Sequence, residues 1–348
     1  MIFKGIEICC PQCKGELEGA GNSREWLECR KCTKHFPIIL EIPDLRIFPD
    51  PYIHFDDDRK KGCKVASRFH DLSFPELVEF YYSITSVVPP HHAKQYARGL
   101  MAGVSRAENA LRMWNASIKK SDEAQGSCLL EIGCGTAPLL VAAAKDFQQM
   151  VGIDIAFRWL VVGKKRLSEA GLDIPLICAC AEALPFPDQQ FDRVIAESTI
   201  EHVKDQKQVV DESRRVLKPG GYFFLSTPNR FSVGPDPHVG ILAGGYFPKR
   251  WLSAYVKRQG GIPPQRRLLS YFTLSRLLMD GGFSKPFIFL PEVSPVQREQ
   301  FGKFMQIGVD LYHLALKMPI LRHLLYGIGP LFHAVAQRPS DSDCPASS

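Results

Sequence analysis

The sequence predicts an α/β protein whose main domain is a doubly wound, mainly parallel sheet. Short apolar runs that suit buried strands alternate with stretches that have apolar residues every three or four positions, as in amphipathic helices. Two of the apolar runs, 129–135 and 150–154, end in turn-forming or acidic residues. This alternation continues over about a hundred residues, and it favours parallel strands joined by crossover helices.

The pattern places each element in order. Strands are expected at 128–133, 150–154, 174–179, 191–197, 221–227, 286–291 and 330–337. Helices are expected at 137–147, 156–169, 205–217 and 273–280. We expect the last strand to be an antiparallel edge strand, and two lid insertions at about 229–271 and 293–327. The second insertion should be helical and lie over the functional site.

Two strand ends predict the kind of ligand. The first strand runs into Glu131-Ile-Gly133-Cys-Gly135, where glycines let the backbone approach a bound molecule closely. The second ends in Asp154, a position where an acid can accept both hydroxyls of a ribose. A dinucleotide fingerprint would need glycine where Pro138 stands, so a nucleoside without a phosphate linker fits better. S-adenosylmethionine (SAM) is such a cofactor; the alternative is a plain α/β domain with a tight turn.

Further motifs resemble a known family. They are Ala181–Asp188, Phe191-Asp192, Ile200–Val203, Arg215–Gly221 and Ser226–Asn229. Over roughly 120–290 this series resembles the class I SAM-dependent methyltransferases of the type 11 group, which includes ubiquinone and menaquinone methyltransferases. The resemblance implies a Rossmann-like seven-stranded sheet. It also implies cofactor contacts at Glu131, Gly133, Gly135, Asp154, Ile155, Ala181, Glu182 and Glu197.

One position departs from the family pattern. The third strand of the family usually ends in an Asp that binds the adenine amino group, and here Cys180 occupies that place. A thiol is a weak hydrogen-bond partner, so we expect adenine to be held by backbone groups near Ala181 and by apolar contacts. The loss should weaken cofactor binding by about 1 kcal/mol. Ala137, which replaces the last glycine of the motif, is tolerable at a helix start.

The N-terminus carries a metal-ligand pattern. Two Cys-x-x-Cys pairs are separated by fifteen residues, which is zinc-ribbon spacing; the pairs are Cys10/Cys13 and Cys29/Cys32. Four thiolates leave no open coordination position, so the zinc should be structural. Cys9 is expected to be a neighbour of the site. The alternative is redox-active or simply buried cysteines. The segment resembles the small ribbon found ahead of some bacterial methyltransferases.

Composition and patterning define the domains. A chain of 348 residues with 45% hydrophobic and 23% charged residues is an ordinary globular protein, and its net charge of +6 is diffuse. We expect a zinc-ribbon at 1–46, a linker (47–65) and helical cap within 47–120, the methyltransferase domain at 121–337, and a disordered tail at 338–348. No apolar stretch is long enough to span a membrane, and the cytoplasm is the expected location.

Methyl transfer to a hydroxyl or amine needs a base near the carboxyl ends of the strands. His202 and His238 are the candidates, and each could instead be a wall residue. A metal-assisted route is an alternative, because quinone O-methyltransferases resemble this region and carry two Glu and one His there. Here Ser198 occupies the family's Glu place, so Glu197 is shifted by one residue and should face the other way.

The acceptor is predicted only as a class. Tyr81, Tyr82 and Pro89–His92 are candidates for the pocket wall. The apolar segment 301–332 favours a hydrophobic acceptor, such as a polyketide, quinone or lipid-linked molecule, with possible peripheral membrane contact, or else it is a packed lid. The rival function is rRNA or tRNA methylation with the ribbon gripping RNA through Arg24, Arg30, Lys31 and Lys34. A non-enzymatic adaptor with a degenerate site is a third possibility.

Overall fold

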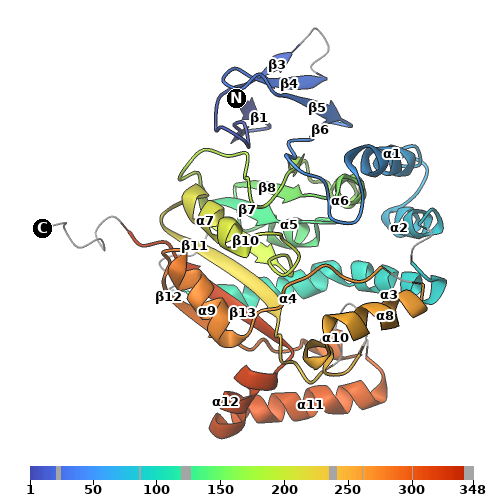
Figure 1. Cartoon of the computed structure of the whole chain (residues 1–348), viewed down its shortest axis with the longest axis vertical. Helices are drawn as coiled ribbons and strands as arrows, with labels where there is room; N and C mark the ends of the chain where they lie inside the picture. The colour runs from blue at the N-terminus through green and yellow to red at the C-terminus, as the bar shows by residue number, and fades with distance from the viewer. Residues whose placement is uncertain are drawn as a thin grey trace, which may run out of the picture.

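The computed structural model describes residues 1–20, 25–85, 88–118, 127–234, 241–260, 262–299 and 301–340. A seven-stranded sheet forms its centre (Figure 1), with the strand order β12-β13-β11-β10-β7-β8-β9. The strands are β7 (Cys128–Ile132), β8 (Gln149–Asp154), β9 (Leu176–Cys178), β10 (Phe191–Glu197), β11 (Leu217–Pro228), β12 (Ser284–Phe289) and β13 (Leu331–Gln337). All seven expected strands are present, and the Rossmann-like prediction is confirmed.

The last strand was expected at the edge of the sheet, and this is wrong. β13 lies between β11 and β12 and is antiparallel to both. Its central residues 332–336 are buried, as an apolar strand between two neighbours should be. β12 forms the edge instead; half of its residues are exposed, and it contains Pro286, which cannot donate to a sheet ladder.

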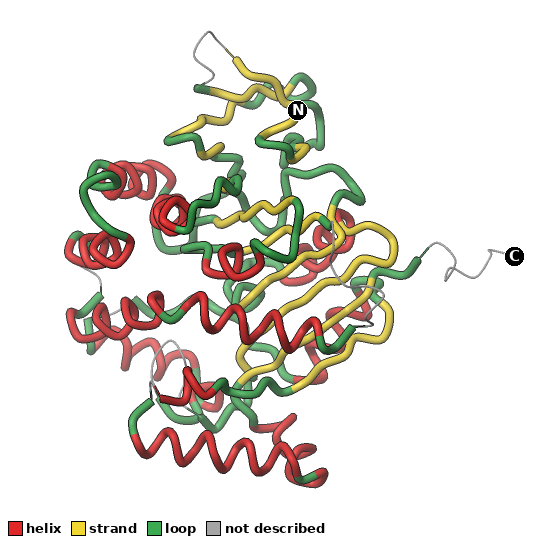
Figure 2. Tube along the Cα trace, turned by 180° about the vertical axis from the view of Figure 1, so that it is seen from behind, coloured by secondary structure: helices red, strands yellow, loops and turns green. Residues whose placement is uncertain are grey.

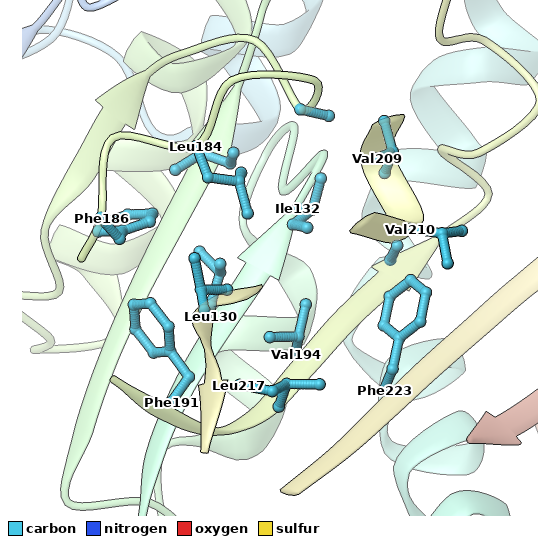
Figure 3. Close-up of a cluster of buried hydrophobic side chains, with 14 of the residues drawn as sticks. Leu130, Ile132, Leu184, Phe186, Phe191, Val194, Val209, Val210, Leu217 and Phe223 are labelled. Carbon is cyan, nitrogen blue, oxygen red and sulfur yellow. The ribbon is translucent and has the colours of Figure 1, made fainter. Parts of the chain in front are cut away.

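Helices cover both faces of the sheet, as the alternation predicted. The crossover helices are α5 (Pro138–Ala143), α6 (Phe157–Glu169), α7 (Gln206–Val216) and α9 (Tyr271–Asp280). One face buries Leu130, Val194 and Phe223 against α7 and α9 (Figure 3), whereas the other buries Leu129, Ile195 and Phe224 beneath α5 and α6. Successive strand residues thus serve opposite cores, which is the two-residue period of a strand buried on both sides.

The N-terminal ribbon packs onto the sheet domain and shares its core. Its strands are β1 (Ile2–Phe3), β2 (Ile6–Glu7), β3 (Leu17–Ala20), β4 (Trp26–Cys29), β5 (His35–Ile39) and β6 (Ile42–Pro43). Ile8 and Leu27 belong to the same buried cluster as Leu130. Cys9 N–H donates to Pro185 O at 2.9 Å, and Leu45 N–H donates to Cys178 O at 2.7 Å. The chain leaving the ribbon therefore covers the β9 edge of the sheet.

The expected linker at 47–65 is instead an ordered part of the domain. It contains most of α1 (Phe55–Ala66), which packs on α6. Asp58 lies in the first turn of α1, is fully buried, and accepts from Phe157 N–H at 2.8 Å at the start of α6. An acid there satisfies orphan helix donors and the positive end of the helix dipole. Asp58, which belongs to the segment predicted to be a linker, thus joins α1 to the start of α6.

The remaining helices belong to the cap and to the insertions. The cap consists of α2 (Phe74–Ser83), α3 (Pro90–Met101) and α4 (Gly103–Asn115), and the insertions contain α8 (Lys249–Arg258), α10 (Pro295–Glu299), α11 (Lys303–Lys317) and α12 (Pro319–Ile328). Among them, α4 packs on α5 and β13. The insertion helices α11 and α12 lie at one end of the molecule, and the view from behind shows the same layering (Figures 1 and 2). Within the described ranges, no helix has the length and apolar character needed to cross a bilayer.

Candidate active site

The glycine loop after β7 approaches neighbouring groups closely. Gly133 has φ +75°, and a Cβ there would lie 2.1 Å from Thr199 Oγ1. Thr199 is held in this place because its hydroxyl donates to Ile132 O at 3.2 Å and Glu197 O at 3.0 Å. Ala137 takes a left-handed conformation at the start of α5, so the replaced glycine of the motif keeps its backbone shape. Only glycine fits at 133, as the sequence predicted.

Asp154 is fixed at the end of β8. Its Oδ2 accepts from Gly135 N–H at 2.9 Å and its Oδ1 accepts from Ala156 N–H at 2.7 Å. Burial raises the pKa of this carboxyl to about 6, although the two backbone donors act in the opposite direction. Each carboxylate oxygen has lone pairs left for a further donor. The orientation therefore suits a pair of ligand hydroxyls.

A cavity of about 310 Å³ joins these strand ends. Five of the eight predicted cofactor residues line it, namely Gly133, Asp154, Ile155, Ala181 and Glu182. Gly135 does not line the cavity, but its N–H donates to Asp154 Oδ2 at 2.9 Å. Burial raises the pKa values of Glu131 and Glu197, and Glu131 Oε2 is a buried atom without a hydrogen-bond partner among the described residues. Glu131 stands two residues before Gly133, which lines the cavity, and a water or ligand could satisfy this buried polar atom.

The segment that follows the ribbon completes this cavity, which the sequence did not predict. Phe48, Asp50, Pro51 and Tyr52 all line it. Arg158 anchors the segment by donating to Asp50 Oδ2 at 3.1 Å and to Asp58 Oδ1 at 2.7 Å. The only available signal was the pair of aromatic residues within a proline-rich stretch, and proximity in space cannot be deduced from it.

Cys180 faces away from the cavity. Its thiol is fully buried and donates to Phe48 O at 3.5 Å, and burial raises its pKa to about 11. The residue thus helps to fasten the segment after the ribbon. Its neighbours Ala179 and Ala181 line the cavity instead. Recognition of adenine by backbone groups near Ala181 stays a prediction.

His202 lies where three cavities meet. Its imidazole is about one-third exposed, at 32%, and burial lowers its pKa, with the positive charge of Arg266 as the next cause. Neighbouring Glu201 is buried, accepts from Thr227 Oγ1 at 3.1 Å, and has a pKa raised to about 7 by burial. His202 is therefore largely neutral near pH 7 and able to accept a proton. The second candidate, His238, lies outside the described residues.

Metal ligands gather at one place only within the described parts of the chain. The sulfur atoms of Cys10, Cys13, Cys29 and Cys32 all lie within 4.8 Å of one another. Tetrahedral zinc with bonds of about 2.3 Å separates its sulfurs by about 3.8 Å, which these positions fit. Gly15 makes room for them, because a Cβ there would lie 3.1 Å from Cys29 Sγ. Glu197, Glu201 and His202 form no such group, so the structure gives the metal-assisted alternative no support.

An aromatic cavity of about 510 Å³ adjoins the cofactor cavity. It is lined by Tyr52, Tyr81, His92, Tyr96 and Trp159, among others, and shares Tyr52, Arg158, Trp159 and His202 with its neighbour. Of the predicted wall residues, Tyr81, Pro89 and His92 line this cavity. Tyr82 does not; it packs edge-on against Trp159 with ring centroids 6.1 Å apart.

Comparison with known proteins agrees with this geometry. Residues 130–225 match the family model described as a methyltransferase domain. The ubiquinone biosynthesis O-methyltransferase of Cereibacter sphaeroides is 34% identical over 37% of this chain and 51% of its own length. The ubiquinone/menaquinone biosynthesis C-methyltransferase of Bordetella avium is 40% identical over 32% of this chain and 44% of its own. The chain thus spans about half the length of these curated relatives.

Among solved structures, a phosphoethanolamine N-methyltransferase of Haemonchus contortus in complex with S-adenosyl-L-methionine is 19% identical, with a TM-score of 0.45 over 68% of this chain and 53% of that one. The cavity lies at the ends of β7, β8 and β10 in the seven-stranded sheet, which is where open α/β sheets bind their ligands. The family match makes the likeness specific: residues 130–225 match a methyltransferase-domain model, and the curated relatives that resemble this region are methyltransferases.

Proposed function

We propose that this protein transfers a methyl group from SAM to an oxygen or nitrogen atom of a small, hydrophobic acceptor with a planar ring. The observation that carries the proposal is the junction of the two cavities at His202, Trp159 and Tyr52. An aromatic wall suits a flat ring, because offset and edge-on ring contacts add to the burial of apolar area. The quinone pathways named for the relatives use ring compounds of this kind.

The residues present fit the cofactor. Asp154 would accept the ribose hydroxyls, and Ala179 and Ala181, which line the cavity, would border the base. SAM, when bound, would supply a methyl group that is activated by its positively charged sulfur, and this sulfur would be left as a neutral thioether. His202 would take the proton that the acceptor loses, and the aromatic wall would hold the ring in line.

The binding step is tested by calorimetric titration of SAM into the full, zinc-assayed chain. The Asp154→Ala variant should bind SAM at least about tenfold more weakly, since hydrogen bonds to a charged acceptor contribute about 1.5–3 kcal/mol each. Asp146→Ala removes an exposed carboxylate of the same domain and should bind normally. A folded wild-type chain that does not bind SAM would favour the adaptor function instead.

The rival RNA function has weaker support. Arg30 on the ribbon is paired with Glu18 at 2.6 Å and Glu16 at 3.4 Å. Lys14 is paired with Glu212 at 2.9 Å. Cations that are already neutralised contribute little to phosphate binding. Changing Arg24, Arg30, Lys31 and Lys34 to Glu should leave methyl transfer nearly unchanged; abolished activity would establish the RNA function. Arg24 lies outside the described residues.

The acceptor would be met at an anionic lipid surface. The helices α11 and α12 expose large apolar side chains, with Phe304 93% and Ile320 79% accessible. Lys303, Lys317 and Arg322 lie on the same helices, and the acid Asp310 is paired with Arg298 at 2.6 Å. Apolar area flanked by cations is the composition of interfacial helices. Wild-type protein should co-sediment with phosphatidylglycerol vesicles, and the Phe304→Asp, Ile320→Asp variant should not.

A further inference from the structure

A third cavity, of about 870 Å³, opens beside His202 and is lined by cations. We name it the basic groove; its charged lining residues are Lys204, Arg230, Lys249, Arg266 and Arg267. None of the described residues that line it is an acid. It shares Pro51, His202, Val203 and Lys204 with the cofactor cavity, and His202 and Pro264 with the aromatic cavity. An occupant would therefore lie next to the site of methyl transfer.

The backbone of the groove is fixed by specific bonds. Arg267 N–H donates to Glu201 O at 2.7 Å, and Gln206 Nε2 donates to Arg267 O at 2.8 Å. These bonds hold the arginine turn against the loop that carries His202. Arg230 N–H donates to Leu269 O at 2.9 Å, and a Cβ on Gly245 would lie 1.7 Å from Arg230 O. The backbone segments that carry Arg230 and Arg267 are therefore fixed by hydrogen bonds and close packing.

Most of these charges lack a counter-ion. In the ranges that the structure covers, Lys204, Arg230, Lys249 and Arg267 form no ion pair with an acidic side chain, whereas many other cations of the chain do. Like charges held together raise the free energy of the ligand-free protein. An anion that enters the groove relieves this repulsion. Arginine also offers paired donors that match the oxygens of carboxylate and phosphate groups.

We propose that the basic groove binds an anionic group, a carboxylate or a phosphate, carried by the methyl acceptor. The inference rests on the proposed function. It describes an acceptor whose ring binds in the aromatic cavity and whose acidic group binds in the basic groove. Gln265 ties the two parts together, because its N–H donates to Tyr52 Oη at 2.7 Å. A nucleic-acid phosphate is less favoured, since the ribbon cations Lys14 and Arg30 are already paired with acids.

The test is calorimetric titration of inorganic pyrophosphate into the full chain, without SAM or acceptor. One saturable site per chain is expected, and the Arg230→Glu, Arg267→Glu variant should bind at least about tenfold more weakly. The matched control, Arg250→Glu with Arg258→Glu, makes the same charge change on exposed residues outside the groove and should bind like wild type. Both variants should retain SAM affinity, which separates a failure of this inference from a failure of the proposed function.

Several outcomes would overturn the inference. These are the absence of saturable pyrophosphate binding to wild type, or equal weakening in the groove variant and its control. Tighter binding of a short RNA that the groove variant abolishes would assign the groove to nucleic acid. Binding to phosphatidylglycerol vesicles that the groove variant abolishes, with no binding of free pyrophosphate, would assign the groove to lipid headgroups. If the double variant does not fold, Lys249→Gln at an exposed position should still weaken pyrophosphate binding measurably.

Discussion

The cofactor cavity and the aromatic cavity share a border but are built in different ways. Most of the cofactor cavity comes from strand ends that follow one another along the chain between 132 and 204. The aromatic cavity collects residues from 52–96, 158–159 and 256–264, together with His202. The first is made by a repeated local unit, a strand and its turn, whereas the second exists only once distant segments have packed. We therefore expect the two cavities to respond differently to mutation.

Both cavities depend on the segment 47–52, which enters directly from the ribbon. The largest expected effect is loss of the metal. Cys10→Ser should reduce bound zinc from about one per chain to near zero, because structural zinc contributes about 10–16 kcal/mol to small zinc modules. The ribbon should open, and both SAM and acceptor binding should weaken because Phe48 and Tyr52 lose their anchor.

The matched control for this variant is Cys9→Ser. Cys9 is buried next to Cys10 but stands outside the four-sulfur group. Its variant should retain zinc by elemental analysis and should bind SAM normally. If Cys9→Ser loses the metal as well, or Cys10→Ser keeps both zinc and SAM binding, the assignment of the ligands is wrong.

The second prediction concerns the charged network behind the cofactor cavity. Arg46 is buried and donates to Asp44 Oδ2 at 2.7 Å, to Asp58 Oδ2 at 2.7 Å and to Ile155 O at 2.9 Å. Arg46→Ala leaves two buried carboxylates without this partner. The free energy of unfolding should fall by about 3–5 kcal/mol, measured by urea denaturation.

Arg59 provides the comparison for Arg46, because it also pairs with Asp44 but its side chain is 28% exposed. Arg59→Ala should cost about 1 kcal/mol or less, since solvent screens a pair at the surface. Equal costs for the two variants would mean that burial does not set the strength of this network. The buried network behind the cofactor cavity would then contribute no more to stability than an ion pair at the surface.

The features that could be predicted from the sequence are those made by neighbouring residues in the chain, and the features that could not are those made by distant segments. The strand ends, the turn around Gly133 and the ligand pattern of the ribbon depend on neighbours in the chain, and each was predictable from residue types and spacing. The segment 47–65 was misjudged because Asp58 is buried by partners about a hundred residues away. β13 was misplaced because strand order depends on the whole sheet. The basic groove was not predicted, because its cations come from separate segments of the chain at 204, 230, 249 and 266–267.

A third prediction separates chemistry from binding at the border of the two cavities. His202→Ala should lower kcat by about 10²–10⁴-fold if this residue takes the proton, and should leave the Kd for SAM unchanged. His92→Ala alters the far wall of the aromatic cavity and should mainly raise KM for the acceptor. Steady-state kinetics with SAM titrations would check both. A His202→Ala enzyme with normal kcat would exclude the base role.

The pH profile sharpens this assignment. Burial and the charge of Arg266 lower the pKa of His202 below the ordinary 6.5, whereas Asp50 and a hydrogen bond to the backbone of Gln265 oppose the shift. The acid limb of kcat/KM should therefore fall below pH 6.5. Glu201, with a pKa of about 7, titrates nearby, so the profile should be repeated in Glu201→Gln. A limb that stays in that variant belongs to His202.

The smallest expected effect tests the cofactor cavity alone. Asp154 has a pKa of about 6 in the SAM-free protein, and only its ionised form accepts two hydroxyls. SAM affinity should be constant above pH 6 and fall by up to about tenfold per pH unit below it. Calorimetry between pH 5 and pH 8 would check this, with Asp154→Asn as the non-titrating control. A flat wild-type profile would remove Asp154 from the proposed contact.

The same carboxyl should have the opposite effect on stability. Its pKa in the folded chain is raised from 3.8 to about 6, so it stabilises the fold fully below pH 3.8 and loses that contribution as the pH rises through 6. The ionised form of Asp154 is thus unfavourable in the ligand-free protein, and hydrogen bonds from a bound ligand would offset this cost. Bound SAM should reverse this pH dependence of unfolding, whereas a ligand confined to the aromatic cavity should not, because Asp154 does not line it.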